Sequence, residues 1–242
     1  VAEEVLASGQ ADMVSMARPF LADPEFVNKA AAGRAQDINT CIGCNQACLD
    51  HTFGGKITSC LVNPRACHET ILVPVPLVKK ERVAVVGAGP AGLAFATEAA
   101  QRGIDVTLFD AASEIGGQFN VAKQVPGKEE FYETLRYFGQ RLQQTGVTVK
   151  LGKRVDAQEL VQAGFQHVVL ATGIRPRLPE IDGITHPKVL GYLDVLRDKK
   201  PVGRSVAVIG AGGIGFDVSE YLLHEGVSPS LDKAKFFAEW GV

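Results

Sequence analysis

The sequence predicts an α/β fold built on parallel sheets, and two observations carry this prediction. First, apolar strand-like runs alternate with helix-like runs between residues 81 and 175, which is typical of parallel strands joined by helices. Second, one strand–glycine–helix unit occurs twice, at Val83–Gly92 and at Val206–Gly215. We therefore expect an α/β domain over residues 81–202 and the start of a second one over residues 203–242.

Residues 1–80 differ in composition from this part. The expected elements of residues 1–39 are a helix, a buried strand and a helix that begins at Asp-Pro and ends at glycine: Val1–Ala7, Ala11–Ala17 and Asp23–Gly33. Residues 40–80 contain all five cysteines and little periodicity. The proline-spaced stretch Val73–Pro76 predicts an extended linker.

The later elements follow from apolar runs and the glycines that separate them. The expected strands are Arg82–Val86, Asp105–Phe109, Thr148–Leu151, His167–Ala171 and Ser205–Ile209. The expected helices are Ala91–Gln101, Lys128–Gln144 and Gly215–His224.

Composition limits the function classes. With 25 Lys+Arg and 27 Asp+Glu among 242 residues, the formal charge is −2, whereas a nucleic-acid-binding protein needs a basic surface. No basic-then-apolar leader opens the sequence, and the longest apolar stretch, Val83–Ala96, is too short and too broken by Gly and Pro to span a bilayer. We expect a cytoplasmic protein with no nucleic acid, membrane or obligate protein partner. The missing initiator Met predicts a piece of a longer polypeptide.

The first glycine turn matches a dinucleotide-binding fingerprint. Gly87, Gly89 and Gly92 lie between an apolar run and a helical run, and Asp110 closes the next strand. In this fingerprint one glycine makes the turn, one lets the backbone approach a pyrophosphate and one packs the helix on the strand. The carboxylate would accept hydrogen bonds from a ribose. Glycine-rich turns alone often serve only packing, but here the strand, helix and acid all lie where the chemistry needs them.

The second glycine turn repeats the pattern at Gly210, Gly212 and Gly215. The sequence ends before the strand that would distinguish NAD from NADP. Two such turns in one chain predict two nucleotides held face to face, a flavin and a nicotinamide.

Two segments between the turns resemble flavoprotein disulfide-reductase-type domains. The strand ending in Ala-Thr-Gly173 resembles the crossing segment whose glycine passes close to the flavin. Gly116-Gly117-Gln118 resembles the second loop over FAD in the same domains. An ordinary strand exit is the alternative.

The cysteines are spaced Cys41-x2-Cys44-x3-Cys48-x11-Cys60, with Cys67 left over. We expect Cys67 to be free, unligated and buried as a small hydrophobic residue. Disulfides are not expected without a secretory context. Structural zinc sites usually pair two C-x2-C knuckles, and this loop has one. Three thiolates in a short loop with a fourth farther on suit a 4Fe–4S cluster. The spacing therefore favours the cluster over zinc.

Five segments together resemble the bacterial NADPH-dependent 2,4-dienoyl-CoA reductase family: CIGCNQACLD, SCLVNPRACHE, VVGAGPAGLAFA, EIGGQFN and VAVIGAGGIGFD. The resemblance runs over essentially the whole chain. It implies the C-terminal end of an FMN-binding (β/α)8 barrel at residues 1–39 and a 4Fe–4S loop with its linker at 40–80. It also implies a Rossmann-like FAD domain at 81–202 and the start of an NAD(P)H domain at 203–242.

The same resemblance implies site residues. Ala17 and Arg18 would lie at the FMN phosphate, where barrels commonly bind phosphate. Cys41, Cys44, Cys48 and Cys60 match the cluster ligands. The matches to FAD contacts are Ala91, Asp110, Gln118, Lys128 and Val155.

The activity implied is electron transfer from NADPH through FAD and a 4Fe–4S cluster to FMN, which reduces a 2,4-dienoyl-CoA substrate bound mainly outside these residues. Three alternatives remain. One is a related barrel–cluster–flavin enzyme, of the enoate reductase or trimethylamine dehydrogenase type. Another is an FAD and iron–sulfur electron-transfer subunit. A third, without enzymatic activity, is a zinc-stapled nucleotide-binding module.

Overall fold

The computed structural model describes residues 2–79 and 81–241, and the chain divides into two compact units, Val1–Pro74 and Val75–Val242. The boundary falls inside the stretch Val73–Pro76 that predicts a linker. Each unit is described below by itself.

The first unit consists of short helices and irregular chain. Its helical elements are α1 (Ala2–Ala7), α2 (Arg18–Ala22), α3 (Phe26–Ala31), the 3₁₀ turn η1 (Ala35–Asp37), the π-helical turn η2 (Gln46–Asp50) and α4 (His51–Phe53). The predicted first helix is confirmed. The helix expected over 23–33 is shorter, and α2 precedes it, with Pro19 in its first turn.

The predicted strand Ala11–Ala17 is wrong. These residues are irregular, and Met13 is 80 % exposed. A strand is held by ladder hydrogen bonds to a neighbour, and no strand occurs among residues 2–74 to supply one. The apolar pattern alone therefore does not form the element, and the barrel end stays a prediction.

A four-stranded parallel sheet organises the second unit. Its strands are β1 (Arg82–Val86), β2 (Asp105–Phe109), β3 (Thr148–Lys150) and β4 (His167–Leu170), in the order β3-β2-β1-β4. β1 pairs with both β2 and β4, for example Val83 with Val106 and Val83 with His167. The predicted α/β fold with a parallel sheet is confirmed.

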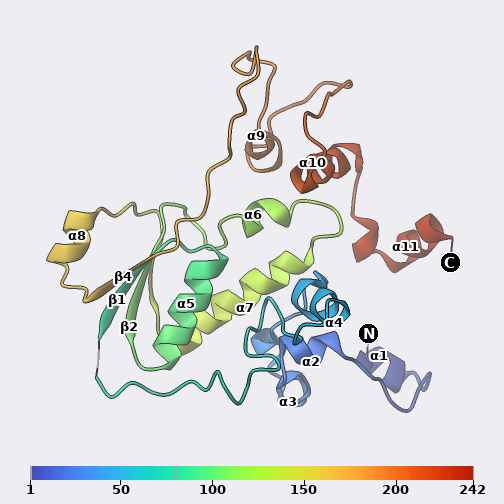
Figure 1. The fold of residues 1–242 in the computed structure, drawn as a ribbon. Coiled ribbons are helices and arrows are strands. Elements are labelled where there is room, and N and C mark those ends of the chain that lie inside the picture. The colour runs from blue at the N-terminus through green and yellow to red at the C-terminus, as the bar shows by residue number, and fades with distance from the viewer. Residues whose placement is uncertain (1, 80, 242) are drawn as a thin grey trace. The chain divides into compact units, whose positions relative to one another are not determined.

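Helices cover both faces of this sheet (Figure 1). The alternation of side chains along β1 sends Val83 and Val85 to one face, against α5 (Pro90–Gln101) and α7 (Glu130–Thr145). It sends Ala84 to the other, where α8 (Ala157–Gln162) contributes Leu160. The central strands β1 and β2 are buried, and parallel strands buried on both faces are continuous apolar runs, which is why these two are predictable. The edge strands β3 and β4 are largely exposed.

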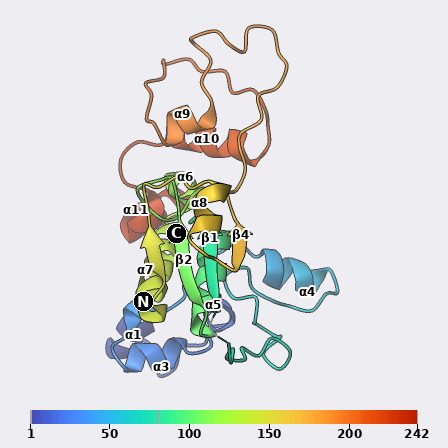
Figure 2. The same ribbon diagram turned by 90° about the vertical axis from the view of Figure 1, so that its left-hand side faces the viewer.

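The remaining helices follow or flank the sheet: α6 (Phe119–Ala122), α9 (Tyr192–Leu196), α10 (Gly213–Leu223), the 3₁₀ turn η3 (Pro229–Leu231) and α11 (Lys233–Trp240). The ribbon views show α9 and α10 side by side (Figures 1 and 2). They share a small apolar cluster with the α6 region, made of Val121, Val125, Leu196 and the half-buried side chains around them.

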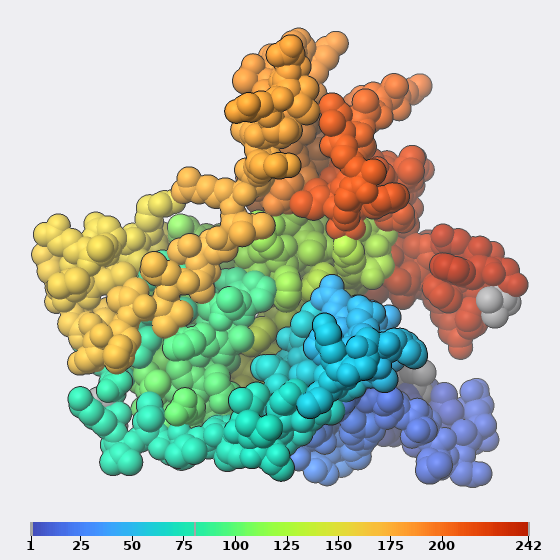
Figure 3. Space-filling model, viewed as in Figure 1, coloured from blue at the N-terminus to red at the C-terminus, as the bar shows by residue number. Residues whose placement is uncertain are grey.

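The predicted strand Ser205–Ile209 is also wrong. The segment is irregular, Ile209 is 78 % exposed, and no strand among residues 81–241 pairs with it. The chain that follows β4, in orange, projects from the green residues of the sheet region in the space-filling view (Figure 3). As at residues 11–17, an apolar run without a pairing partner stays irregular.

None of the helices within residues 2–79 and 81–241 is long and apolar enough to cross a bilayer.

Candidate functional site

The first glycine turn joins the end of β1 to the start of α5. Gly87 has a φ of +111°, in the left-handed region, and a Cβ there would clash with the backbone carbonyl of Ala171. A Cβ at Gly92 would clash with the carbonyl oxygen of Gly87. Both positions therefore require glycine for folding, whatever the turn binds.

Gly89 differs, because the space beside it is open. Its backbone is extended, with φ −76° and ψ −179°, a conformation that any residue adopts. The nearest atom to a Cβ would be the Cα of Gly117, 4.0 Å away, and a Cβ on Gly117 would lie 3.0 Å from the Cα of Gly89. The backbones of two glycine loops thus face each other and form a cradle that a side chain at either position would fill.

The N-terminus of α5 opens onto this cradle. Gly89 is the N-cap and Pro90 the first helical residue, so the N–H of Ala91 lies in the first turn. First-turn N–H groups have no helical carbonyl to bond and carry the positive end of the helix dipole. Such a helix start with a glycine loop suits the phosphates of a nucleotide.

Asp110 follows β2, and both of its carboxylate oxygens accept backbone hydrogen bonds. The N–H of Ala88 donates to Oδ2 at 2.6 Å, and the N–H of Ala112 donates to Oδ1 at 2.8 Å. The bond from Ala88 ties the carboxylate to the first glycine turn. Each carboxylate oxygen can accept a further bond, so Asp110 can receive a ribose hydroxyl while it holds the turn.

The segment after β4 passes directly beside the turn. Ala171 donates its N–H to the carbonyl oxygen of Val86 at 2.8 Å, and its own carbonyl borders Gly87. Gly173, two residues later, has a φ of +73° and is exposed. Gly173 therefore follows Ala171, the residue that contacts the first glycine turn.

Val155 and Gln118, two other predicted FAD contacts, lie at separate places in the second unit. The N–H of Lys153 donates to the carbonyl oxygen of Asp110 at 2.8 Å, which brings the chain leading to Val155 beside the loop after β2. Val155 itself is half-buried. Gln118 is exposed, and its Oε1 accepts a bond from the Tyr192 hydroxyl at 3.3 Å.

Lys128 makes an ion pair that the sequence does not predict. Its Nζ lies 2.6 Å from each carboxylate oxygen of Asp217 on α10. Both side chains are partly exposed, and exposed ion pairs contribute at most about 1 kcal/mol. The structure thus connects Lys128 to the second glycine unit, and its contact with FAD stays a prediction.

The second glycine turn has the same backbone conformation as the first. Gly210 has a φ of +116°, Gly212 is extended with φ −89° and ψ −179°, and a Cβ on Gly215 would clash with the Gly210 carbonyl. These three features match those of Gly87, Gly89 and Gly92 in turn. The second turn is formed although the segment before it is not a strand, so the glycine pattern itself determines the conformation.

In the first unit, the four cysteines predicted as ligands line one pocket. The other residues of the wall are Arg18, Leu21, Ile42, Asn45, Ala47, Leu61 and Val62. Cys67 is not among the lining residues. Its predicted burial is wrong, because it lies in a turn and is exposed.

Local backbone features bring the cysteines together. Asn45 has a φ of +59°, which Asn tolerates better than most residues, and the π-helical turn η2 carries Cys48. The N–H of Ser59 donates to the carbonyl oxygen of Ala47 at 2.7 Å. This bond fixes Ser59 beside Ala47, so the cysteines that follow them, Cys60 and Cys48, are held near each other.

Ala17 and Arg18 begin α2. Ala17 is the N-cap and is exposed. Arg18 donates from Nη1 to the Oδ1 of Asn45 at 2.6 Å, so its guanidinium borders the cysteine pocket. Their predicted contact with an FMN phosphate stays a prediction.

Burial raises the pKa of the Cys60 thiol, the backbone N–H groups of Val62 and Asn63 lower it, and the thiols of Cys41 and Cys44 raise it again, with a net upward shift. Metal ligation requires the thiolate, so binding at this site would release a proton from Cys60.

The four cysteine sulfurs are soft donors, the kind that ligate zinc or an iron–sulfur cluster. No three His, Cys, Asp or Glu side chains within residues 2–79 and 81–241 are placed to hold one metal ion. Zinc needs its sulfurs about 2.3 Å from one point, whereas a four-iron cluster takes one thiolate at each corner. Four cysteines around one pocket supply the number and type of donors that a four-iron cluster takes, and the cluster stays a prediction.

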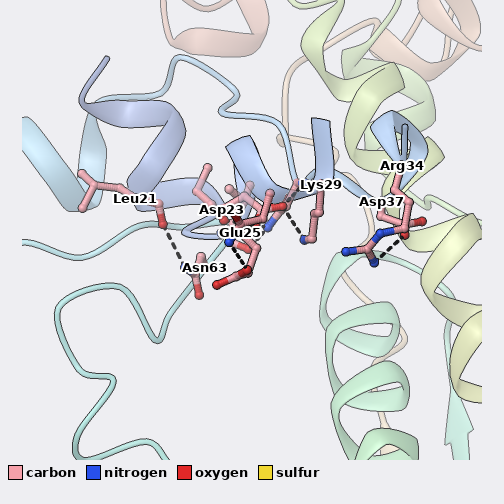
Figure 4. A network of polar contacts seen from close by, with 11 residues as sticks. Leu21, Asp23, Glu25, Lys29, Arg34, Asp37 and Asn63 are labelled. Carbon is pink, nitrogen blue, oxygen red and sulfur yellow. Dashed lines mark hydrogen bonds and ion pairs between the residues drawn. The ribbon is translucent and has the colours of Figure 1, made fainter. Parts of the chain in front are cut away.

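Sequence reasoning missed a polar network beside this pocket, formed by Asp23, Asn39 and Asn63. Figure 4 shows Asp23 turned toward Lys29 and Asn63 reaching the backbone of Leu21. The sequence signal that could have indicated this network is the position of the two asparagines. Asn39 lies shortly before Cys41, and Asn63 lies shortly after Cys60.

Comparison with known proteins gives one family match. The family described as "Pyridine nucleotide-disulphide oxidoreductase" matches residues 81–231. This range includes both glycine turns and excludes the cysteines.

Relatives match over nearly the whole chain. A metal reductase of Desulforamulus reducens is 38 % identical over 230 residues, which cover 93 % of this chain and 34 % of the relative. A cinnamate reductase of Clostridium sporogenes is 31 % identical over 227 residues, 93 % of this chain and 34 % of the relative. The chain thus spans about a third of the length of these relatives.

Two solved structures are similar as well. The structure of a 2-naphthoyl-CoA reductase in complex with 2-naphthoyl-CoA has a TM-score of 0.88 and 36 % identity, over 91 % of this chain and 34 % of that one. Histamine dehydrogenase from Rhizobium sp. 4-9 has a TM-score of 0.68 and 32 % identity, over 74 % of this chain and 27 % of that one.

Proposed function

This chain belongs to the pyridine nucleotide-disulphide oxidoreductase family, and from that premise we propose that it is the electron-transfer part of a flavin-dependent oxidoreductase. Its proposed role is to pass electrons from NAD(P)H toward a second flavin on a barrel domain. The observation that carries the proposal is that two glycine turns share the same backbone conformation. The same chain also places four cysteines around one pocket.

The first turn is the proposed FAD site. The cradle between Gly89 and Gly117 would hold the pyrophosphate. The N–H of Ala91, in the first turn of α5, would donate to the pyrophosphate. Asp110 would accept the ribose hydroxyls. The remaining proposed contacts are Gln118, Lys128, Val155 and Gly173.

The second turn, Gly210–Gly215, is the proposed nicotinamide-nucleotide site. Gly212 occupies the position that Gly89 has in the first turn, so its backbone would approach the pyrophosphate. The family resemblance favours NADPH over NADH.

The cysteine pocket is the proposed 4Fe–4S site, and Ala17 and Arg18 are proposed at an FMN phosphate. Cys41, Cys44, Cys48 and Cys60 would each bind one iron. When bound, these groups would supply hydride acceptance and single-electron transfer, chemistry that side chains do not provide. The role of the chain is to provide a separate binding place for each group.

The proposed substrate is a conjugated carbon–carbon double bond next to a carbonyl, either as an enoate or as an acyl thioester. The cinnamate reductase and the 2-naphthoyl-CoA reductase among the similar proteins support this class. Within it, 2,4-dienoyl-CoA is the substrate that the sequence resemblance favours. The net reaction consumes one NAD(P)H and one proton and adds two hydrogens to the double-bond system.

The test uses the complete protein that contains these residues, purified without oxygen. Flavin extraction, iron and sulfide analysis and the absorption spectrum should give FAD, FMN and a cluster. Anaerobic addition of NADPH or NADH should bleach the flavin bands. A dienoyl-CoA, a cinnamate and a 2-naphthoyl-CoA, each added in turn, should restore the bands for the true substrate. Protein with flavin but without iron contradicts the cluster proposal.

The second candidate function is amine oxidation, supported by the similarity to histamine dehydrogenase. In that reaction electrons flow in the other direction, from substrate to flavin. Bleaching by an amine in the absence of NAD(P)H would establish it.

A further inference from the structure

The cysteine loop has two ends, and both attach to the same three residues at the end of α2. Residues 38–40 lead into Cys41, and residues 61–63 leave Cys60. Side chains and backbone from both ends bond to residues 21–23. This leaves little freedom in how far Cys60 lies from the other three thiols.

Asp23 is the buried centre of these contacts. It is 3 % exposed, and its carboxylate accepts bonds from Lys29 Nζ at 2.6 Å, the Asn39 N–H at 2.8 Å and the Glu25 N–H at 3.0 Å. Three donors, one of them charged, offset the cost of burying a carboxylate. The entry to the cysteine loop is thereby fixed to α2.

The amide side chains connect the exit of the loop to the same place. Asn39, 6 % exposed, donates from Nδ2 to the carbonyl oxygens of Val62 at 2.8 Å and Ala22 at 3.3 Å. Asn63 donates from Nδ2 to the carbonyl oxygen of Leu21 at 2.9 Å. The Oδ1 of Asn39 has no partner among the described residues, so the donors are what Asn39 contributes here.

We infer that Asp23, Asn39 and Asn63 form a clamp that positions Cys60 against Cys41, Cys44 and Cys48 before any metal arrives. That the clamp serves to load a cluster rests on the proposed function. That the clamp positions the thiols is independent of the proposed function. By joining the loop ends in the folded chain, the clamp reduces the conformational freedom that ligand binding would otherwise have to remove.

The first test measures thiol proximity without metal. The complete protein, freed of metal and kept reduced, is treated with dibromobimane, which links two neighbouring thiols and becomes fluorescent. Mass spectrometry identifies links between Cys60 and the other three ligand cysteines. The variants are Asn39→Leu and Asn63→Leu, which keep side-chain size and remove the donors. The control is Asn28→Leu, which removes an exposed bond to Glu25.

The clamp predicts that both variants form links to Cys60 about tenfold more slowly than wild type, equivalent to about 1.4 kcal/mol, with the control unchanged. Wild-type rates in both variants overturn the proposal. If the far-UV circular dichroism spectrum shows that Asn39→Leu is unfolded, the result for Asn63→Leu decides the test. Asn63 is only half-buried and its side chain makes one bond, so its replacement disturbs the fold less.

The second test measures iron and sulfide bound after anaerobic reconstitution, with FAD content as the control. Slower loading in the variants with unchanged FAD supports the clamp, and equal loading contradicts its role in assembly. If wild type binds no iron while the cross-linking still depends on Asn39 and Asn63, the cluster proposal fails and the clamp stands.

Discussion

Gly89 and Gly92 lie three residues apart, yet their replacement should fail for different reasons. Gly89 has an extended backbone and open space beside it, so Gly89→Val should fold and lose FAD. Gly92→Val should lose stability, because its Cβ would meet the Gly87 carbonyl, and overpacking of this kind costs about 1–3 kcal/mol or more. Melting of the FAD-free proteins separates the two. Full FAD occupancy in Gly89→Val would contradict the assignment of Gly89 to the FAD site. The iron content of this variant should stay normal.

Asp110→Ala should weaken FAD binding about tenfold or more. Bonds to charged groups contribute roughly 1.5–3 kcal/mol each, and about 1.4 kcal/mol is a factor of ten. The bond from Ala88 adds a second cause, since its loss frees the glycine turn. The measurement is titration of the FAD-free protein by flavin fluorescence. The matched control is Asp105→Ala, an exposed carboxylate at the start of the same strand. Equal affinity in both variants and wild type would make Asp110 only a strand-end residue.

At the scale of elements, α10 and its turn should tolerate one glycine substitution and not another. Gly215→Ala should abolish flavin reduction by NAD(P)H while FAD stays bound, because its Cβ would collide with the Gly210 carbonyl. Gly213→Ala should keep activity, since nothing lies within 4 Å of a Cβ there and Pro90 holds the equivalent position in the first turn. Anaerobic stopped-flow measures both. Normal reduction in Gly215→Ala would separate this turn from nicotinamide binding.

The ion pair between Asp217 on α10 and Lys128 in the loop before α7 allows the role of Lys128 to be tested. If Lys128 acts only through Asp217, Lys128→Met and Asp217→Asn should change FAD affinity equally, and the double variant should add nothing. If Lys128 also contacts FAD, Lys128→Met should be the weaker binder of the two. The FAD titration of the single and double variants distinguishes these outcomes.

The strands that the sequence predicts correctly are those that pair with another described strand. The apolar runs of β1, β2, β3 and β4 pair with one another, so pattern and structure agree. The runs at 11–17 and 205–209 also contain apolar residues, but no strand among the described residues pairs with either. Pairing partners are a property of tertiary structure, which a local pattern does not contain.

The site follows the same division. The glycine turns were predictable, because the clash that requires glycine at Gly92 comes from the Gly87 carbonyl only five residues earlier, and the same pair recurs at Gly215 and Gly210. The gathering of four cysteines in one pocket was predictable from their spacing and chemistry. The Asp23–Asn39–Asn63 contacts were not, because they join positions up to 42 residues apart through ordinary polar side chains. The Lys128–Asp217 pair, 89 residues apart, was missed for the same reason.

At the scale of the whole molecule, the proposed cofactors are divided between the two units, so their losses should be independent. Cys60→Ser replaces a soft thiolate with a harder oxygen and should reduce iron content, while FAD remains because its residues lie in the other unit. NADPH should still bleach FAD at a near-normal rate, and FMN reduction should slow by orders of magnitude. Anaerobic stopped-flow on iron-assayed protein is the measurement. Wild-type FMN reduction in iron-free protein would make the cysteine pocket structural only.

The glycine loops that face each other at Gly89 and Gly117 also have a thermodynamic consequence. They come from different stretches of the chain, and the nearest contact across them is backbone against backbone. A nucleotide lying between them would bind the native fold and not the unfolded chain, so ligand concentration would enter the unfolding equilibrium directly. At a free concentration of 100 times the dissociation constant, that linkage contributes about 2.7 kcal/mol. The supply of flavin in the cell would then govern how long the second unit survives proteolysis as well as whether it can carry electrons.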